Sequence, residues 1–118
     1  MSDFHEVIIV GGGVGGSALA ASLAGSGVDV LLLEQTDVYQ DRVRGEWIAP
    51  WGVTEVRRMG LLATLLAAGG HYVARHITYD ESRTPAEAEA KTLPLGIFAP
   101  DVPGPLTLGN PHHCQTLF

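Results

Sequence analysis

The feature that most constrains this chain is a glycine-rich turn between an apolar strand pattern and a small-residue helix pattern. Residues 7–10 read Val-Ile-Ile-Val, and Gly11-Gly12-Gly13-Val14-Gly15-Gly16 follows directly. Residues 17–23 then continue with the serines, alanines and leucines of a helix. Gly11, Gly13 and Gly16 therefore fit the G-x-G-x-x-G spacing, with a strand before it and a helix after it.

Each of these three glycines has its own physical reason. Gly11 permits a tight turn from strand to helix, because glycine has no Cβ to restrict its backbone. A missing side chain at Gly13 lets backbone N–H groups approach a pyrophosphate, and at Gly16 it lets the helix pack closely on the strand. The N–H groups of the turn and the positive end of the helix dipole would then face the phosphates. The predicted cofactor contacts in this turn are Gly11, Gly12, Gly13, Val14, Gly15 and Gly16.

The residues downstream complete a strand–helix–strand unit over residues 5–34. Gly27 is placed to end the helix, and residues 28–33 form a second apolar run that is typical of a buried parallel strand. That run ends at Glu34, 23 residues after Gly11, where a carboxylate accepts hydrogen bonds from the ribose hydroxyls of adenosine. The sequence therefore predicts an α/β fold with a Rossmann-like βαβ dinucleotide-binding unit. A glycine-rich loop without a ligand is the alternative.

Length and charge restrict the class of protein further. With 118 residues the chain allows one domain at most, which is small for a complete dinucleotide enzyme. The net charge of −6 argues against non-specific nucleic-acid binding, because few cations are available to neutralise phosphates. The single cysteine excludes an internal disulfide and fits a reducing compartment. Because no signal peptide and no span of ~20 apolar residues is present, we expect a cytoplasmic protein without a membrane span.

Residues 35–70 combine a loop with two short helices. A polar stretch without periodicity, residues 35–41, predicts a loop. Pro50 is expected to form a turn, after which apolar positions at helical spacing predict a helix over residues 53–58. A second helix is expected over residues 61–68, and the pair of glycines that follows should end it.

The pattern changes in residues 72–109. Alternating residues predict an exposed strand over 72–79, and a second candidate strand over 93–98 is weakened by its proline. Between them, residues 82–91 fit either a short helix after a proline or a loop. Residues 110–118 predict the start of a helix, with Asn as the N-cap and Pro at the first helical position. Because so short a helix and so small a sheet are unstable alone, the chain reads as an incomplete part of a longer protein.

The segment Arg42-Val43-Arg44-Gly45-Glu46, which follows the βαβ unit, supplies a recognisable pattern. Together with the glycine turn, it makes the chain resemble the N-terminal part of the flavin-dependent aromatic hydroxylases and related monooxygenases. Their glutathione-reductase-like FAD fold is typified by para-hydroxybenzoate hydroxylase. The resemblance runs through the whole chain in order. It implies FAD as the cofactor, held by the glycine turn and Glu34, and we include the adjacent Gln35 among the predicted contacts.

The resemblance also implies roles for residues beyond the first unit. Arg44, and with it Arg42, would contact the flavin side of the cofactor, because a planar guanidinium donates well to phosphate, ribityl or flavin oxygens. A surface ion pair with Glu46 or Asp41 is the alternative for these arginines. Gln115 would contact the cofactor from the last helix, although the family often has an arginine at the start of that helix. A solvated helix residue is the alternative for Gln115.

The function implied by the resemblance is that of a flavoprotein oxidoreductase. The simplest form is a monooxygenase that uses NAD(P)H and O₂ to hydroxylate or epoxidise a small organic substrate. No catalytic residue is assigned, because the later Asp-Gly and Gly-Asp motifs of the family are absent from this sequence. No metal site is predicted, because the adjacent His112, His113 and Cys114 cannot easily converge on one ion. An NAD-dependent Rossmann oxidoreductase and a truncated nucleotide-binding remnant stay open as alternatives, and the substrate and oligomeric state are undetermined.

Overall fold

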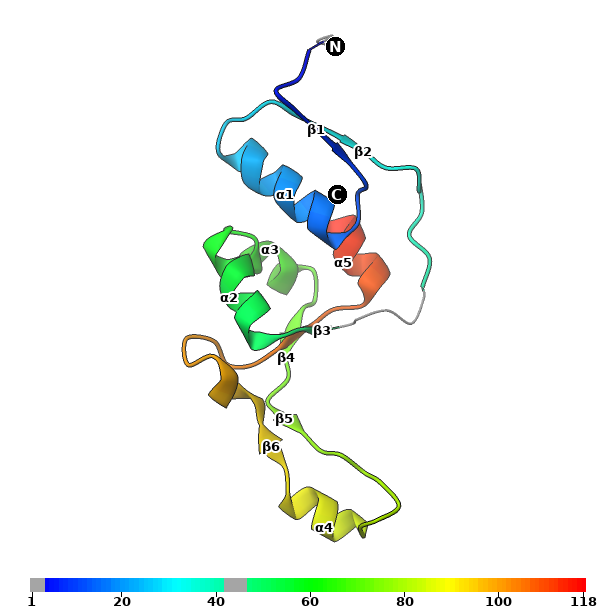
Figure 1. The fold of residues 1–118 in the computed structure, drawn as a ribbon, viewed down its shortest axis with the longest axis vertical. Coiled ribbons are helices and arrows are strands. Elements are labelled where there is room, and N and C mark those ends of the chain that lie inside the picture. Colours follow the sequence, from blue (N-terminus) through cyan, green and yellow to red (C-terminus); the bar gives the residue numbers. More distant parts are fainter. Residues whose placement is uncertain (1–3, 42–46) are drawn as a thin grey trace.

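The computed structural model describes residues 4–41 and 47–118. Its first unit consists of the strand β1 (Val7–Val10), the helix α1 (Val14–Gly25) and the strand β2 (Val30–Leu33). The two strands are parallel, with Val7 opposite Val30 and Val10 opposite Leu33. Helix α1 connects them across one face of the pair (Figure 1). The predicted βαβ unit is therefore confirmed.

Helix α1 ends where the sequence predicts. Gly27 has a φ of +85°, a conformation that glycine adopts at little cost. Its N–H donates to the Ala24 carbonyl at 2.9 Å, and the N–H of Val28 donates to the Leu23 carbonyl at 3.1 Å. This pair of bonds is a Schellman motif, which satisfies the last carbonyls of the helix and turns the chain back toward β2.

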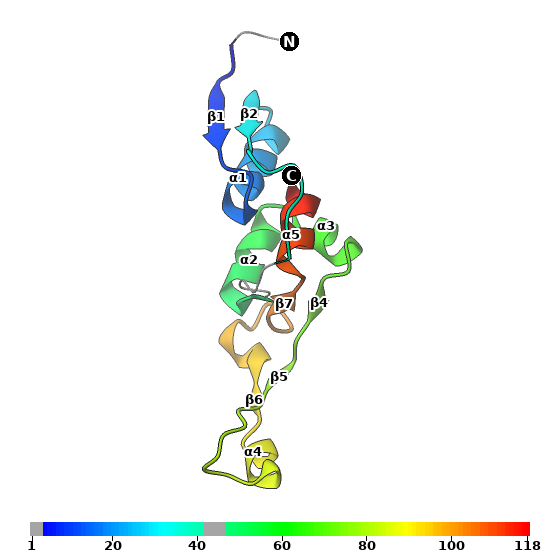
Figure 2. The same cartoon turned by 90° about the vertical axis from the view of Figure 1, so that its right-hand side faces the viewer.

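The two faces of the β1–β2 pair differ in exposure. Ile9 lies on the face toward α1 and would contact a Cβ at Gly16. On the opposite face, Val10 is 82% exposed and Leu33 is 47% exposed. The prediction that β2 is parallel is confirmed, whereas the prediction that it is buried is wrong in the described part of the chain. The reason is that α1 covers only one face of the pair (Figure 2).

The middle of the molecule holds the buried apolar core. The strand β7 (Leu106–Thr107) pairs antiparallel with both β3 (Trp47–Ile48) and β4 (His71–Tyr72). The helices α2 (Pro50–Arg58), α3 (Leu62–Ala67) and α5 (Asn110–Leu117) pack around this small sheet. The core residues are Val53, Leu65, Ala99, Val102, Leu106 and Leu117, with Val14 and Ala18 of α1 packed against them. The core therefore joins α1 to the helices that follow it.

Two helix starts differ from the sequence predictions. Pro50 is the first residue of α2 instead of a separate turn, because proline lacks only an N–H that the first helical position leaves unpaired. At the start of α5, Gly109 is the N-cap, and Asn110 already has helical geometry. The prediction of Asn110 as N-cap is therefore wrong by one residue. The helix ends behave as predicted, since Gly69 has a φ of +99° just after α3.

An arm projects from the core and makes the molecule elongated, 63 × 30 × 21 Å (Figure 1). It consists of β5 (Arg75–His76), α4 (Pro85–Ala90) and β6 (Leu93–Pro94), and a 3₁₀ turn, η1 (Leu95–Phe98), leads back to the core. Residues 82–91, for which the sequence allowed a short helix or a loop, contain the helix α4. The predicted strands over 72–79 and 93–98 are too long, because the structure has only the short strands β4, β5 and β6 there and residues 95–98 form η1. Pro105, opposite Val73, and Pro94 have no N–H with which to continue the antiparallel pairing. No helix in the described ranges is long and apolar enough to cross a membrane.

Candidate functional site

The glycine turn between β1 and α1 depends on two positions without side chains. Gly11 has a φ of +109°, and its N–H donates to the Leu33 carbonyl at 2.7 Å, which joins the turn to the end of β2. A Cβ at Gly16 would lie 1.8 Å from the Gly11 carbonyl oxygen. Gly11 and Gly16 therefore meet structural requirements of the turn, as the motif predicts.

The N-terminus of α1 is open to an anion. Gly13 is its N-cap, is exposed, and would have no atom within 4 Å of an added Cβ. The first helical hydrogen bond runs from the Ser17 N–H to the Gly13 carbonyl at 2.9 Å, so the N–H groups before it have no acceptor within the helix. Neither a capping side chain nor an acidic residue occupies the first turn. This geometry suits a diphosphate.

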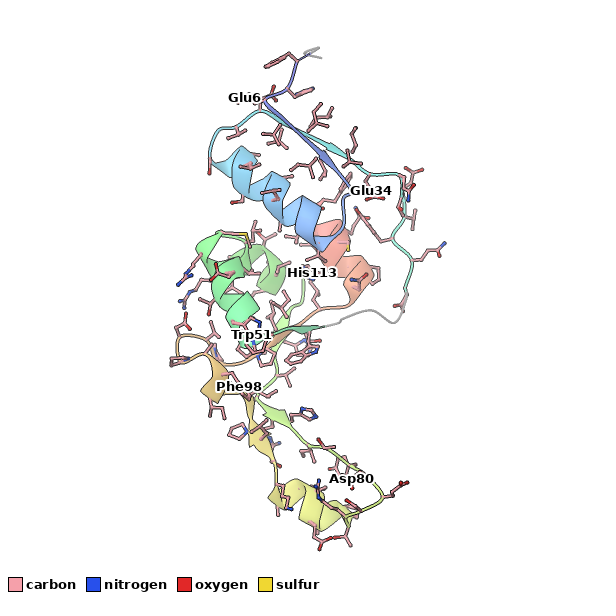
Figure 3. The ribbon with its side chains drawn as sticks, in the orientation of Figure 1. Glu6, Glu34, Trp51, Asp80, Phe98 and His113 are labelled. Atoms are coloured by element: carbon pink, nitrogen blue, oxygen red, sulfur yellow. The ribbon has the colours of Figure 1, made fainter. Side chains whose placement is uncertain are left out.

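Glu34 lies at the end of β2, beside the first turn of α1 (Figure 3). Its Oε2 accepts the N–H of Gly12 at 2.5 Å, and its Oε1 accepts the N–H of Thr36 at 2.8 Å. Hydrogen bonds from Gly12 first and Thr36 second hold the pKa of Glu34 below its ordinary value. The carboxylate is therefore ionised at neutral pH, as ribose recognition requires. Ribose binding by Glu34 itself stays a prediction.

Gly12 has a role that the motif does not reveal. Its N–H is bound to Glu34, and its carbonyl accepts the Ser17 hydroxyl at 2.9 Å and the Tyr39 hydroxyl at 2.5 Å. A Cβ at Gly12 would lie 2.8 Å from the ring of Phe118. The Gly12 N–H is therefore committed within the protein. Its predicted contact with the cofactor is left untested.

Tyr39 belongs to the loop over residues 35–41 and is half-buried. Burial, and next the negative charge of Glu34, raise the pKa of its hydroxyl above the ordinary value. The hydroxyl thus stays protonated and donates to Gly12. Its ring meets the ring of Phe118 edge to face, with centroids 6.4 Å apart.

A cavity of about 650 Å³ opens beside this turn. Four of the predicted cofactor residues line it: Gly13, Val14, Glu34 and Gln35. Sequence reasoning missed the other lining residues, which are Thr36, Val38, Tyr39, Gln40, Asn110 and Cys114. The loop residues could have been predicted as part of the site, because an aromatic residue, Tyr39, stands in the polar stretch directly after Glu34. Nothing in the sequence indicates Asn110 and Cys114, because they reach the cavity only through the packing of α5 against α1.

Of the predicted site residues that the structure describes, no others line the cavity. Gln115 is exposed on α5 and is absent from the cavity lining, so its contact with the cofactor stays a prediction. Arg42 and Arg44 lie outside the described residues, and their roles stay predictions too. His112 bonds through Nε2 to the Ala68 carbonyl at 2.7 Å, whereas His113 is buried. Within residues 4–41 and 47–118, no three or more acidic, histidine or cysteine side chains gather as metal ligands would.

Comparison with known families identifies the cofactor that the chain binds. The model of the family described as "FAD binding domain" matches residues 5–100, which include the glycine turn, Glu34 and the helices α2 and α3. The chain belongs to this FAD-binding domain family. The predicted cofactor, FAD, and the resemblance to the flavin-dependent monooxygenases are thereby confirmed.

Individual relatives of this FAD-binding chain are monooxygenases. Squalene monooxygenase of Mus musculus is 41% identical over 80 residues, which are 67% of this chain and 14% of that protein. Squalene epoxidase of Gibberella zeae is 43% identical over 60 residues, 49% of this chain and 12% of that protein. The structure of p-nitrophenol 4-monooxygenase from Pseudomonas putida DLL-E4 superposes with a TM-score of 0.76 at 22% identity, over 99% of this chain and 29% of that one. The chain thus spans a small part of the relatives that it matches.

The described residues fit the adenosine and diphosphate parts of FAD. An open helix N-terminus, a turn that excludes side chains, and an ionised carboxylate beside it are the groups that the pyrophosphate and ribose need. No described residue of the cavity is assigned to the isoalloxazine ring. The described site therefore offers groups that suit the adenosine and diphosphate parts of the cofactor.

Proposed function

We propose that this chain is the FAD-binding segment of a monooxygenase that takes electrons from NAD(P)H and inserts oxygen from O₂ into a small organic substrate. One oxygen atom enters the substrate, as a hydroxyl or an epoxide, and the other leaves as water. The flavin supplies the redox chemistry when bound, and the protein supplies its position and the surrounding environment. The match of residues 5–100 to the FAD-binding family, with the glycine turn and Glu34 on one cavity, carries this proposal.

The residues of this chain contribute binding and orientation. The N–H groups at the start of α1 would hold the pyrophosphate, and the Glu34 carboxylate would accept the ribose hydroxyls. Arg44 and Arg42 would approach the flavin side. The matched proteins include a squalene epoxidase and a p-nitrophenol 4-monooxygenase, and the proposal covers both an epoxide and a hydroxyl product. Cytoplasmic localisation stays a prediction from the sequence.

The decisive experiment is an FAD titration of the purified chain, followed by flavin fluorescence and by the visible absorption band. We expect saturable binding that weakens about tenfold or more in Glu34→Ala and Arg44→Ala, because each removes charge-assisted hydrogen bonds. Glu55→Ala and Arg58→Ala are matched controls, because these residues pair with each other at 2.7 Å on exposed α2. A folded chain that does not bind FAD contradicts the proposal. Binding of NAD in place of FAD would favour a nicotinamide-dependent oxidoreductase.

A further inference from the structure

We propose that the hydroxyls of Ser17 and Tyr39 are positioning groups that orient the Gly12–Gly13 peptide, so that the Gly13 N–H faces the diphosphate of the bound nucleotide. This inference rests on the proposed function. The two hydroxyls donate to one acceptor, the Gly12 carbonyl, at 2.9 Å from Ser17 and 2.5 Å from Tyr39. Neither residue belongs to the glycine motif.

The orientation of this peptide needs support from outside the turn. Gly11, Gly12 and Gly13 are consecutive, so no Cβ restricts the rotation of the peptides between them. A trans peptide is planar and places its C=O and N–H on opposite sides. Fixing the Gly12 carbonyl toward Ser17 and Tyr39 therefore turns the Gly13 N–H away from both hydroxyls. Gly13 is exposed and lines the cavity, which is where a phosphate would arrive.

The two donors come from different parts of the chain. Ser17 lies on α1 and is fully buried, with 0% of its surface exposed. Tyr39 lies 27 residues after Gly12, in the loop that follows β2. The ring of Phe118 packs edge-on against Tyr39 and lies against the Cα of Gly12. The Gly12 residue is thus held at its carbonyl by two hydroxyls, at its N–H by Glu34, and on its open side by an aromatic ring.

The same contacts strengthen the donor. Hydrogen bonds to a carbonyl polarise its peptide, and the N–H of that peptide becomes a better donor. Two hydroxyls on the Gly12 carbonyl therefore improve both the direction and the strength of the Gly13 N–H. The benefit concerns phosphate, because the two hydroxyls act on the Gly12–Gly13 peptide, whereas Glu34 bonds to the N–H of the Gly11–Gly12 peptide. This separation makes the inference testable with ligands that differ only in phosphate.

The test compares the Kd of ADP with the Kd of adenosine for Ser17→Ala, Tyr39→Phe and the double variant, by titration calorimetry or ligand-observed NMR. We expect each single variant to weaken ADP about threefold to tenfold, and the double variant more, with adenosine changed less than about twofold. Ser26→Ala and Tyr79→Phe are matched controls. Ser26 bonds to the Ser22 carbonyl at the far end of α1, and Tyr79 bonds to Glu89 on the arm.

The outcomes separate this inference from the function on which it rests. An unchanged ADP affinity, or an equal loss for ADP and adenosine, would overturn the positioning role. Tyr39→Phe keeps the ring on Phe118 and the Ser17 bond, so it stays informative if Ser17→Ala folds poorly. If the folded original chain binds neither ADP nor FAD, the proposed function fails first. ADP binding that is lost selectively in both variants supports both.

Discussion

The βαβ unit and the projecting arm are stabilised by different kinds of contact. In the unit, the contacts that shape the cavity join residues far apart, as Gly12 is to Glu34 and to Tyr39. In the arm, Tyr79 bonds to Glu89 only ten residues away, and the Thr84–Glu87 pair lies within one helical turn. Buried backbone groups and close approaches determine the first region, whereas exposed side-chain bonds and the short β5–β6 pairing hold the second.

This difference shows which region tolerates change. A glycine that faces a carbonyl oxygen cannot be replaced without moving a strand or a helix. An exposed cap on a short helix affects that helix and little else. We therefore expect the effects of substitution to fall steeply from the glycine turn to the arm, and three measurements test this order.

The largest effect is expected at Gly16. Gly16→Ala places a Cβ 1.8 Å from the Gly11 carbonyl oxygen, so α1 must shift away from β1. We expect the free energy of unfolding to fall by about 3 kcal/mol, the upper part of the range for overpacking. Urea unfolding followed by circular dichroism measures it. Gly15→Ala is the control, because its Cβ meets nothing within 4 Å and should cost no stability. Equal stability of the two variants would contradict the comparison.

An intermediate effect is expected from His113, which is 5% exposed and whose Nε2 has no hydrogen-bond partner among the described residues. Burial lowers the pKa of His113 from its ordinary 6.5. The unfolded chain therefore binds this proton more readily, and stability should fall as the pH falls below about 6.5, by at most ~1.4 kcal/mol per pH unit. Unfolding measured at several pH values tests the slope. His113→Leu should flatten it, and an unchanged slope would assign the effect to other groups.

The smallest effect is expected at the arm. Thr84 and Glu87 form a capping box at the start of α4, in which the Thr84 N–H donates to Glu87 at 2.8 Å. Thr84→Ala should destabilise this helix locally by about 1 kcal/mol. Hydrogen exchange should quicken at the amides of α4 and stay unchanged in α1. Faster exchange throughout the chain would show that the arm supports the whole fold, against the comparison drawn above.

Local sequence signals predicted the elements that depend on neighbouring residues. The glycine spacing, the apolar runs on either side and Gly27 gave the βαβ unit and the end of α1, because each signal acts within a few residues. The glycines after α3 likewise ended that helix. Strand lengths in residues 72–98 were overestimated, because antiparallel pairing stops where a proline supplies no N–H, as at Pro94 and at Pro105.

The candidate site likewise contains residues that the sequence predicted and residues that it did not. Gly13, Val14, Glu34 and Gln35 were predicted and line the cavity, because a motif places them at the end of one strand and the start of one helix. Asn110 and Cys114 could not be found from the sequence, since they join the cavity only when α5 packs beside α1. The hydrogen bond from the Gly12 N–H to Glu34 also could not be predicted from the sequence, because it depends on the position of the Glu34 carboxylate.

The sequence by itself determined that this chain forms a dinucleotide-binding turn, because the absence of side chains at Gly11 and Gly16 and the acid at Glu34 are local chemical facts. Only the tertiary structure decided how that turn is held. Ser17, Tyr39 and Phe118 meet at Gly12 from three separate segments, and no spacing rule relates them. The physical reason is that hydrogen bonds and ring contacts act over a few ångströms in space, however many residues separate the partners along the chain.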